Sequence, residues 1–412
     1  MPGAVIAGLL ELLSARDAPA FAPSLDAAGW DALAREAVRH GVAPLVHARL
    51  ASAGAQWPVP EPVRNALKAC HLRTGLENLR LLARLAAVLR GLQAEGVQVI
   101  VLKGAYLAQA VYGEPALRSM GDADILVRPA DLERATRVLH SAGWREGAAT
   151  ALTSVGGGGH QLPTFVLGGA QVELHWAIED DTSPFVIDDD GLWQRAVRCE
   201  VGGAPALALS AEDLLLHLCL HAAYGHGWLQ FESGLRPLCD IAACLRRFEG
   251  RIDWPVLVAR ARAWRVHTSA WLTLTLLRDL LRAGVPQHVL DGLVPRPVDR
   301  ALVDTATRLV LGHHYRELVD HLPVLGRSWL TKYWHRLPPP ARWRAHALPG
   351  PDALATAYPS FRSGALRPLR YAAHWADLLN DVARLSFGRR GRVLVAQERS
   401  RMQVLRWLES AR

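Results

Sequence analysis

The spacing of apolar residues changes at Gly96, and this change restricts the chain to folds that combine helices with a sheet. Before this glycine, apolar residues recur every three or four positions, and residues 61–95 form one long helical pattern. After it, Val97–Leu102 is a short apolar run, rich in β-branched residues, of the kind that forms a buried strand. We therefore expect an N-terminal helical region at residues 1–95, followed by a core that contains strands. Within the long helical pattern, leucines recur in rough register at Leu76, Leu79, Leu82, Leu85 and Leu89.

The region after this change alternates strand and helix patterns. Asp122–Val127 is predicted to form a second strand. Two further strands, Gln161–Leu167 and Gln171–Ile178, are separated by Gly168-Gly169, which is a signal for a hairpin turn. These patterns predict an α+β fold, with a mixed sheet flanked by helices. The helical patterns between the strands are Ala105–Tyr112 and Asp131–Ala142.

Strand patterns fade from Ser210 onward. Ser210-Ala-Glu-Asp213 has the composition of a capping box at the start of a helix. We expect the core to occupy residues 96–209, a helical domain to occupy 210–325, and a linker with C-terminal helices to occupy 326–412. Helical patterns lie at residues 232–248, 253–266, 268–283, 298–322, 369–386 and 392–410.

The composition is that of a globular protein with an excess of basic residues. Charged residues make up 21% of the chain, and the formal net charge is +8. This balance favours an anionic partner such as a nucleotide, a nucleic acid or a membrane surface. The chain has three lysines, Lys68, Lys103 and Lys332, against 44 arginines, however, which indicates a coding bias. The arginines are also spread along the chain, which does not favour a general nucleic-acid-binding patch.

The sequence lacks recognisable targeting and zinc-binding motifs. No uncharged apolar stretch approaches the roughly 18 residues that span a bilayer, and the N-terminus lacks the basic start of a signal peptide. The five cysteines match no zinc-ribbon or thioredoxin spacing, so we expect reduced, mostly buried thiols. We therefore expect a cytoplasmic protein with no transmembrane segment.

The main chemical signal is Asp122-Ala-Asp124 at the start of the second predicted strand. Side chains alternate along a strand, so both carboxylates should share one face while Ala123 and Ile125 point into the core. Two carboxylates this close repel one another unless a cation lies between them. Their hard oxygen atoms suit Mg²⁺ or Mn²⁺, which stabilise the attacking and leaving oxygens of a phosphoryl displacement. An Asp-x-Asp pair is also typical of solvated loops, but its place at the start of an apolar strand favours a metal site.

Two neighbouring features extend this predicted site. The Lys103-Gly104 turn follows the first strand, where glycine lets backbone amides approach a phosphate and lysine supplies a positive charge. Glu173 shares a strand face with His175 and is the candidate third carboxylate, both as metal ligand and as base for the attacking group. The alternative for Glu173 is an exposed glutamate on an edge strand.

Histidines form further candidates. His217 and His221 lie one helical turn apart, and His226 follows them. The first two could bind zinc, but no third ligand has a fitting spacing, so a structural or substrate-contact role is favoured. His160 has two open interpretations, a contact with the nucleotide or a cap at the end of a strand.

Taken in order, these motifs resemble the uncharacterised nucleotidyltransferase family NTP_transf_5, which belongs to the DNA polymerase β-like superfamily. The resemblance covers roughly residues 75–285. It rests on Leu102-Lys-Gly-Ala-Tyr-Leu107, Tyr112-Gly113, Arg118 and Asp122-x-Asp-Ile-Leu-Val127, and continues through His160, Val172-Glu-Leu-His175, Glu212-Asp-Leu-Leu-Leu-His217 with His221, Leu238-Cys-Asp240-Ile and Ile252-Asp-Trp254.

The resemblance implies a nucleotidyltransferase core and assigns roles to its residues. Asp122 and Asp124 would bind the metal, and Glu173 matches a position that is often aspartate in relatives. Lys103-Gly104 stands where the superfamily usually has the Gly-Ser turn that holds the triphosphate. Arg118 would be a phosphate contact or a structural contact near the metals.

The function expected from these residues is transfer of a nucleoside monophosphate from a nucleoside triphosphate to an acceptor hydroxyl, with Mg²⁺ or Mn²⁺. The acceptor could be a small molecule, a peptide or a protein. One alternative is a catalytically weak protein of the same fold that binds a nucleotide or a partner. The other, suggested by the basic balance, is an enzyme that modifies nucleic acid.

Overall fold

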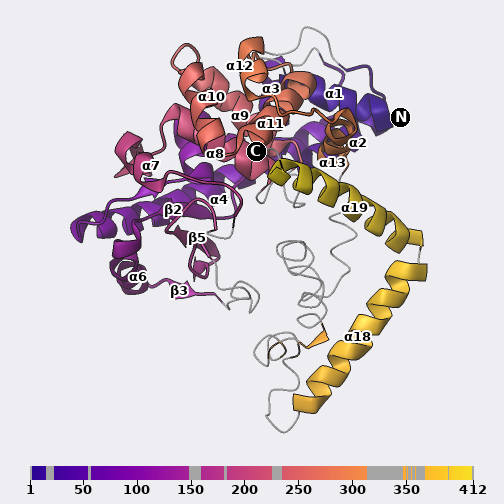
Figure 1. The fold of residues 1–412 in the computed structure, drawn as a ribbon. Helices are drawn as coiled ribbons and strands as arrows, with labels where there is room; N and C mark the ends of the chain where they lie inside the picture. The colour runs from indigo at the N-terminus through magenta and orange to yellow at the C-terminus, as the bar shows by residue number, and fades with distance from the viewer. Residues whose placement is uncertain are drawn as a thin grey trace.

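The computed structural model places helices around a single mixed sheet (Figure 1). This arrangement confirms the predicted α+β class, in which a sheet core is followed by a large helical region. The structure describes residues 2–14, 23–53, 57–147, 159–180, 183–224, 234–312, 347, 348, 350, 354, 358, 367–387 and 389–410.

The sheet has seven strands in the order β3-β4-β5-β2-β1-β7-β6. Its centre is mixed, because β2 is parallel to β5 but antiparallel to β1, and β1 is parallel to β7. The predicted hairpin is confirmed: β4 and β5 are antiparallel, and both turn glycines have the positive φ that a two-residue turn requires, +52° at Gly168 and +83° at Gly169. The strands are β1 Ile100–Val101, β2 Ala123–Leu126, β3 Arg145–Glu146, β4 Phe165–Leu167, β5 Ala170–His175, β6 Val197–Val201 and β7 Ala204–Ala208.

Several strands differ from the prediction. The first two are shorter than Val97–Leu102 and Asp122–Val127, and Asp122 immediately precedes β2, since pairing with β5 begins at Ala123. The hairpin of β6 and β7 was not predicted, although Gly202-Gly203 at its turn is a hairpin signal. At Gly202 a side chain is excluded, because a Cβ atom would lie 2.6 Å from the carbonyl oxygen of Leu82.

The N-terminal helices pack on the sheet mainly through α4. The long helical pattern is confirmed as one helix, but its leucines do not share a face. Leu82, Leu85 and Leu89 are buried, whereas Leu76 and Leu79 are exposed. A helix turns by about 100° per residue, so a spacing of three residues rotates successive side chains around the axis. The helices of this region are α1 Pro2–Ser14, α2 Ala27–Arg39, α3 Ala43–Ala53 and α4 Glu61–Ala94.

The helix predicted after β1 begins two residues early and changes type. It starts as α5, Lys103–Tyr106, and continues as the π-helix η2, Leu107–Val111. The amide of Tyr112 donates to the carbonyl of Leu107 at 2.9 Å, five residues back, which is the π-type pattern. Helix α6, Leu132–Ser141, confirms the other helical pattern in the core.

The region after Ser210 is helical as predicted, and the Ser210 side chain accepts a hydrogen bond from the Asp213 amide at the start of α8. Helix α19 packs against α13, and Figure 1 shows α18 extending away from the rest of the described chain. Helix α12 was not predicted. The helices are α7 Asp189–Arg195, α8 Ala211–Ala223, α9 Arg236–Arg247, α10 Trp254–Ala263, α11 His267–Leu281, α12 Gln287–Leu293, α13 Arg300–Leu311, α18 Arg367–Phe387 and α19 Arg389–Ser410.

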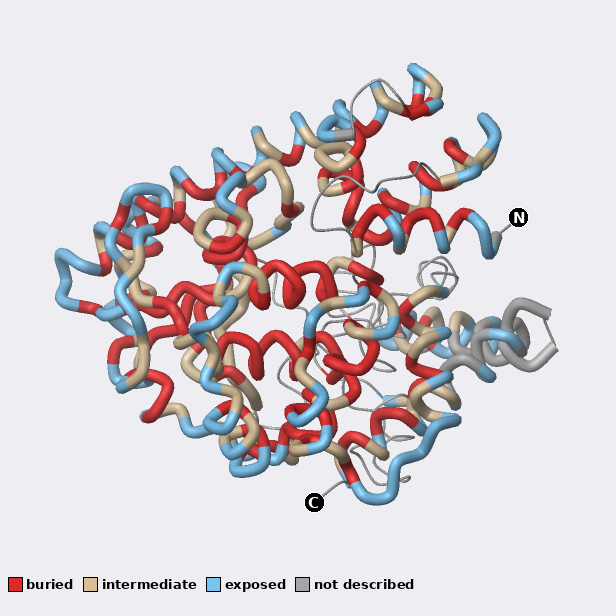
Figure 2. Tube along the Cα trace, turned by 90° about the horizontal axis from the view of Figure 1, so that it is seen from above, coloured by how far each residue is buried: buried red, intermediate tan, exposed pale blue. Residues whose placement is uncertain are grey.

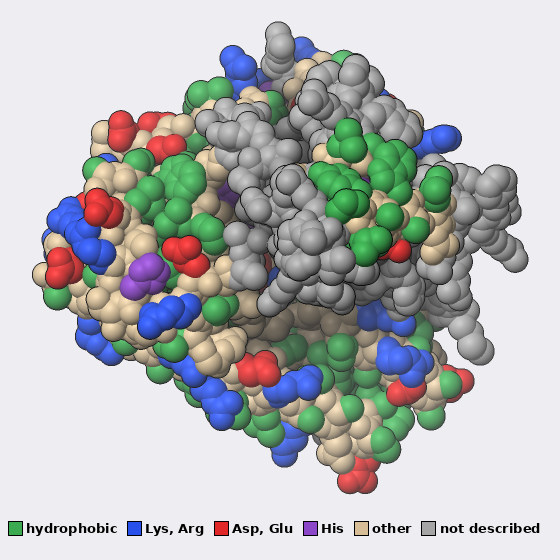
Figure 3. Space-filling view, turned by 90° about the horizontal axis from the view of Figure 1, so that it is seen from below, with side chains coloured by type: hydrophobic (Ala, Val, Ile, Leu, Met, Phe, Trp, Pro, Cys, Tyr) green, Lys and Arg blue, Asp and Glu red, His purple; other side chains and the backbone are tan. Residues whose placement is uncertain are grey.

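The buried apolar residues form one contiguous cluster that includes the N-terminal helices, the central strands and the helices after Ser210 (Figure 2). The division of the chain at residues 95, 209 and 325 stays a prediction. In the part of the chain that the structure describes, none of the helices combines the length and apolarity needed to cross a membrane. On the face shown in Figure 3, basic and acidic side chains are interspersed, as their spread along the sequence predicts.

Candidate active site

Strands β2 and β5 bring two of the predicted carboxylates together. Their parallel register places Asp124 directly beside Glu173. The alternating neighbours Ala123, Ile125 and Leu174 are fully buried in the core, so both carboxylates lie on the opposite face of the sheet. Strand β5 is paired on both sides, by β4 and β2, and the interpretation of Glu173 as an edge-strand residue is therefore wrong.

His175 completes this group. Its Nε2 atom lies 3.2 Å from Oδ1 of Asp124 and 3.5 Å from Oε2 of Glu173. In the described part of the chain, Asp124, Glu173 and His175 form a group whose ligand atoms lie within 4.8 Å of one another. The sequence placed His175 on the same face as Glu173 but did not identify it as a ligand, because strand alternation does not show which residues contact the neighbouring strand.

Asp122 lies beside this group, just ahead of β2. Burial, together with the negative charges of Asp124 and Glu173, raises the pKa of its carboxyl group to about 6. Burial would also raise the pKa of Asp124, but Lys103 and the hydrogen bond with His175 outweigh burial and hold that pKa well below its usual value. The site thus concentrates more negative charge than its own residues neutralise, which is the condition that a bound cation relieves.

Lys103 points its ammonium group at the acids. Nζ lies 3.5 Å from Oδ1 of Asp124, and the lysine side chain is only 15% exposed. Its φ is +33°, in the left-handed region that a non-glycine residue rarely adopts. Residues held in such conformations cluster at active sites and ligand-binding sites. The turn after β1 therefore keeps a cation at the position where its backbone conformation favours glycine.

Gly104 and Arg118 are in contact with each other. A Cβ atom at Gly104 would lie 2.9 Å from Nη1 of Arg118, so a larger residue would displace the guanidinium. Arg118 donates to both carboxylate oxygens of Asp240 on α9, at 2.9 to 3.1 Å, and the Tyr112 hydroxyl donates to the same carboxylate at 2.9 Å. The structure thus supports the structural contact among the two roles predicted for Arg118. A phosphate contact stays a prediction.

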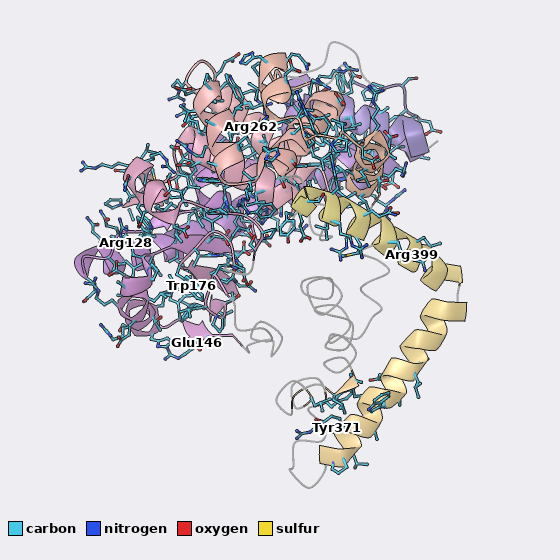
Figure 4. All side chains as sticks on the ribbon, viewed as in Figure 1. Arg128, Glu146, Trp176, Arg262, Tyr371 and Arg399 are labelled. Atoms are coloured by element: carbon cyan, nitrogen blue, oxygen red, sulfur yellow. The ribbon has the colours of Figure 1, made fainter. Side chains whose placement is uncertain are left out.

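His160 lies next to the end of β5. Its ring centroid is 5.4 Å from that of His175, and its carbonyl accepts a hydrogen bond from the amide of Trp176. Trp176, labelled in Figure 4, directly follows β5, and its ring packs over Gly159. His160 is therefore close to the acids and also ties its own segment to the sheet. Both of its open interpretations remain compatible with this position.

Helix α8 places two histidines, His217 and His221, near the acids. His217 is buried, and burial followed by the charge of Lys103 lowers the pKa of its imidazole to about 3. His221 is near enough that its charge lowers the pKa of Asp124. The rings of His217 and His221 are 6.3 Å apart, and His226 lies outside the described residues. The sequence predicted this pair with a structural or substrate-contact role, and α8 brings both histidines close to the acids.

Two buried imidazole nitrogens at this site lack partners. Nδ1 of His175 and Nε2 of His217 have no hydrogen-bond partner within the described parts of the molecule. An unpaired buried polar atom is costly, and such atoms mark places where a bound molecule, water or ion completes the hydrogen bonding. Here both flank the cluster of acids.

A mixed sheet that presents paired carboxylates beside a Lys-Gly strand-to-helix turn defines a nucleotidyltransferase-type core. The chain belongs to the uncharacterised nucleotidyltransferase family NTP_transf_5, whose family model matches residues 26–282, more than half of the chain. The match begins earlier than the motifs indicated and includes all of α2 and α3. No curated protein and no solved structure matches the chain.

Proposed function

We propose that this nucleotidyltransferase moves a nucleoside monophosphate from a nucleoside triphosphate to an acceptor hydroxyl. The observation that carries the proposal is the pairing of Asp124 with Glu173 in register on adjacent parallel strands, with Asp122 beside them. Two acids on one sheet face, with a third directly ahead of the strand, are suited to binding a divalent cation together with a triphosphate.

The residues present fit a divalent cation such as Mg²⁺ or Mn²⁺. Asp122, Asp124 and Glu173 offer oxygen ligands, and burial together with the negative charges of the other two acids raises the pKa of Asp122. When bound, the cation would neutralise the phosphate oxygens and stabilise the leaving group. His175 either adds a nitrogen ligand or orients Asp124 by the hydrogen bond between them.

The side chains around the acids have distinct roles in this proposal. Lys103, now paired with Asp124, binds a phosphate once a cation takes over the charge of that carboxylate. Glu173 is partly exposed and accepts a hydrogen bond from Thr164 at 3.3 Å, so it can accept a proton from the acceptor hydroxyl. Neutral His217 offers its unpaired nitrogen to the nucleotide or the acceptor.

The test follows an α-phosphate label. Purified protein, each nucleoside triphosphate in turn, and Mg²⁺ or Mn²⁺ would be incubated with a cell extract that supplies acceptors. We expect covalent labelling of an acceptor that is lost in Asp124→Asn. The matched control is Glu146→Gln, because Glu146 is an exposed acid on the edge strand β3 (Figure 4). Equal labelling by wild type and Asp124→Asn would refute the proposal.

A second candidate is a protein of the same fold that binds nucleotide with little turnover. The ion pair of Lys103 with Asp124 favours it, since both groups are engaged with each other. Equilibrium binding of a nucleoside triphosphate without any labelled product, in wild type and in Glu173→Gln alike, would select this candidate. Modification of nucleic acid stays a prediction from the basic balance alone.

A further inference from the structure

Helix α4 carries a narrow row of exposed apolar side chains. Leu72, Leu76 and Leu79 are 60%, 51% and 58% exposed. Ala69 and Ala83, which are also exposed, continue the row in both directions. The five positions are spaced by three, four, three and four residues. We call Ala69, Leu72, Leu76, Leu79 and Ala83 the α4 seam.

The spacing of the α4 seam is that of the a and d positions of a coiled coil. Two apolar residues in every seven form the stripe that one helix presents to another helix. The opposite face of α4 is fixed to the protein: Leu81 and Asn78 are buried, and Asn78 donates to the carbonyl of Arg118 at 2.6 Å. The seam is therefore displayed on a helix that is already formed and held in place.

The charges beside the α4 seam are almost all basic. Between residues 62 and 94 the only acidic residue is Glu77. Arg73 and Arg80 directly follow two of the seam leucines, at positions whose side chains face the flanks of a partner helix. The arginines and lysines in the same segment are Arg64, Lys68, Arg73, Arg80, Arg84 and Arg90.

These flanking charges disfavour a second copy of the chain as the occupant. In an antiparallel pair of identical seams, Arg73 and Arg80 would face the same arginines of the other copy. In a parallel pair, Lys68 would face Arg73. Like charges across such an interface suppress pairing. A membrane surface is disfavoured as well, because an interfacial helix has a broad apolar face, commonly with tryptophan or phenylalanine, and the seam is a single row of leucine and alanine.

We propose that the α4 seam docks an acidic amphipathic helix of another protein, with leucine-like residues on the seam and glutamates or aspartates beside Arg73 and Arg80. Arginine and carboxylate groups facing one another across the seam would set the choice of partner. The seam lies on the opposite side of α4 from residues that pack against the core. The proposal stands whether or not nucleotidyl transfer is observed.

The test uses two labelled peptides of about four heptads, both with leucine at the a and d positions. One carries glutamate at the flanking positions and the other carries lysine. Fluorescence anisotropy with the full chain should show that the acidic peptide binds at least tenfold more tightly than the basic one. Leu76→Asp should weaken binding of the acidic peptide at least tenfold. The matched control is Leu379→Asp on α18, an equally exposed leucine at 64%, which should bind as wild type does.

The second part of the peptide-binding test reverses the charges of Arg73 and Arg80. Arg73→Glu combined with Arg80→Glu should exchange the preference, so that the basic peptide binds more tightly. Equal binding of both peptides, no binding of the acidic one, or binding that Leu76→Asp leaves unchanged would overturn the proposal. So would a wild-type dimer in sedimentation that Leu76→Asp converts to monomer, or binding to anionic phospholipid vesicles that the same substitution abolishes.

Discussion

Arg118, in the loop ahead of β2, is held by both carboxylate oxygens of Asp240 on α9, 122 residues further along the chain. Both side chains are almost completely buried. Arg118 also contacts Gly104 in the turn after β1, so this ion pair joins the helical region to the strands that carry the acids. The ion pair, together with the hydrogen bond from Tyr112 to Asp240 and the one from Arg236 on α9 to the carbonyl of Ser119, connects the segment ahead of Asp122 to α9.

Asp240→Asn should destabilise the protein strongly. The substitution leaves the Arg118 guanidinium buried without its counter-charge, and breaking a buried pair costs about 3–5 kcal/mol. Urea denaturation followed by circular dichroism would measure the loss. Asp279→Asn, in the exposed pair with Arg278, is the control and should change the free energy of unfolding by less than about 1 kcal/mol. Equal effects of the two substitutions would contradict the structural role given to Arg118.

Replacing Lys103 should separate stability from activity. Glycine relieves the left-handed backbone strain, so Lys103→Gly should be more stable than Lys103→Ala by about 1 kcal/mol, while both variants lose nucleotidyl transfer with the ammonium group. Arg282 also has a positive φ, of +50°, and lies on the surface. Arg282→Gly should likewise be more stable than Arg282→Ala by about 1 kcal/mol, and it should keep the nucleotidyl transfer of the wild type. If Lys103→Gly kept wild-type transfer, the lysine would have no part in the site.

Asp122 should make stability depend on pH in buffer without divalent cations. Because the folded-state pKa, about 6, is higher than the unfolded value of 3.8, the protonated form is favoured in the folded protein. The corresponding stability is fully present below pH 3.8 and is lost as the pH rises through about 6. Asp122→Asn should therefore have a larger free energy of unfolding than wild type at pH 7.5, by up to about 3 kcal/mol, and this difference should shrink toward pH 4.

The titration of the Asp122 carboxyl group also predicts how the affinity for a divalent cation depends on pH. Mn²⁺ binding, followed by its paramagnetic resonance signal, should strengthen as the pH rises to about 6 and level off above it, since the cation competes with the proton on Asp122. Asp190→Asn, at an exposed acid on α7, should leave both profiles as in wild type. A wild-type affinity that is flat between pH 5 and pH 7 would exclude Asp122 from the metal site.

His217→Leu should remove activity without loss of stability. The unpaired nitrogen of His217 is a buried polar atom that costs about 1–3 kcal/mol, so an apolar residue of similar size should be tolerated or even stabilising. Nucleotidyl transfer should fall at least tenfold. His267 on α11 is also buried with an unpaired ring nitrogen, and His267→Leu should leave transfer unchanged. Thermal unfolding and the labelling assay distinguish the two variants, and equal activity would assign His217 to packing alone.

Local patterns were sufficient to predict the centre of the site. Alternation along β2 and β5 placed Asp124 and Glu173 on the faces of their strands opposite the apolar core residues, and the two glycines of the β4–β5 hairpin have the backbone conformation that their sequence indicates. Patterns with a period of two or 3.6 residues do not specify which strands become neighbours. The approach of His175 to Asp124 and the arrival of His217 on α8 both depend on that pairing and on helix docking.

The same limit explains the errors in the helices. The spacing of the α4 leucines predicts a shared register, but only tertiary packing decides which of them the sheet covers, and Leu76 remains exposed. The partner of Arg118 lies on a helix far along the chain, and no local rule connects them. Local sequence patterns do not predict the contacts between segments that are distant in the chain.

The π-helix Leu107–Val111 has a consequence of its own for Tyr112. One additional residue in a helical turn shifts the phase of everything that follows it by roughly a quarter of a turn. Tyr112 reaches the carboxylate of Asp240 in this shifted phase. Deleting a single residue from Leu107–Val111 would restore α-helical winding and turn the Tyr112 hydroxyl away from Asp240. A deletion that removes none of the clustered acids would thus still break a hydrogen bond to the carboxylate that holds Arg118.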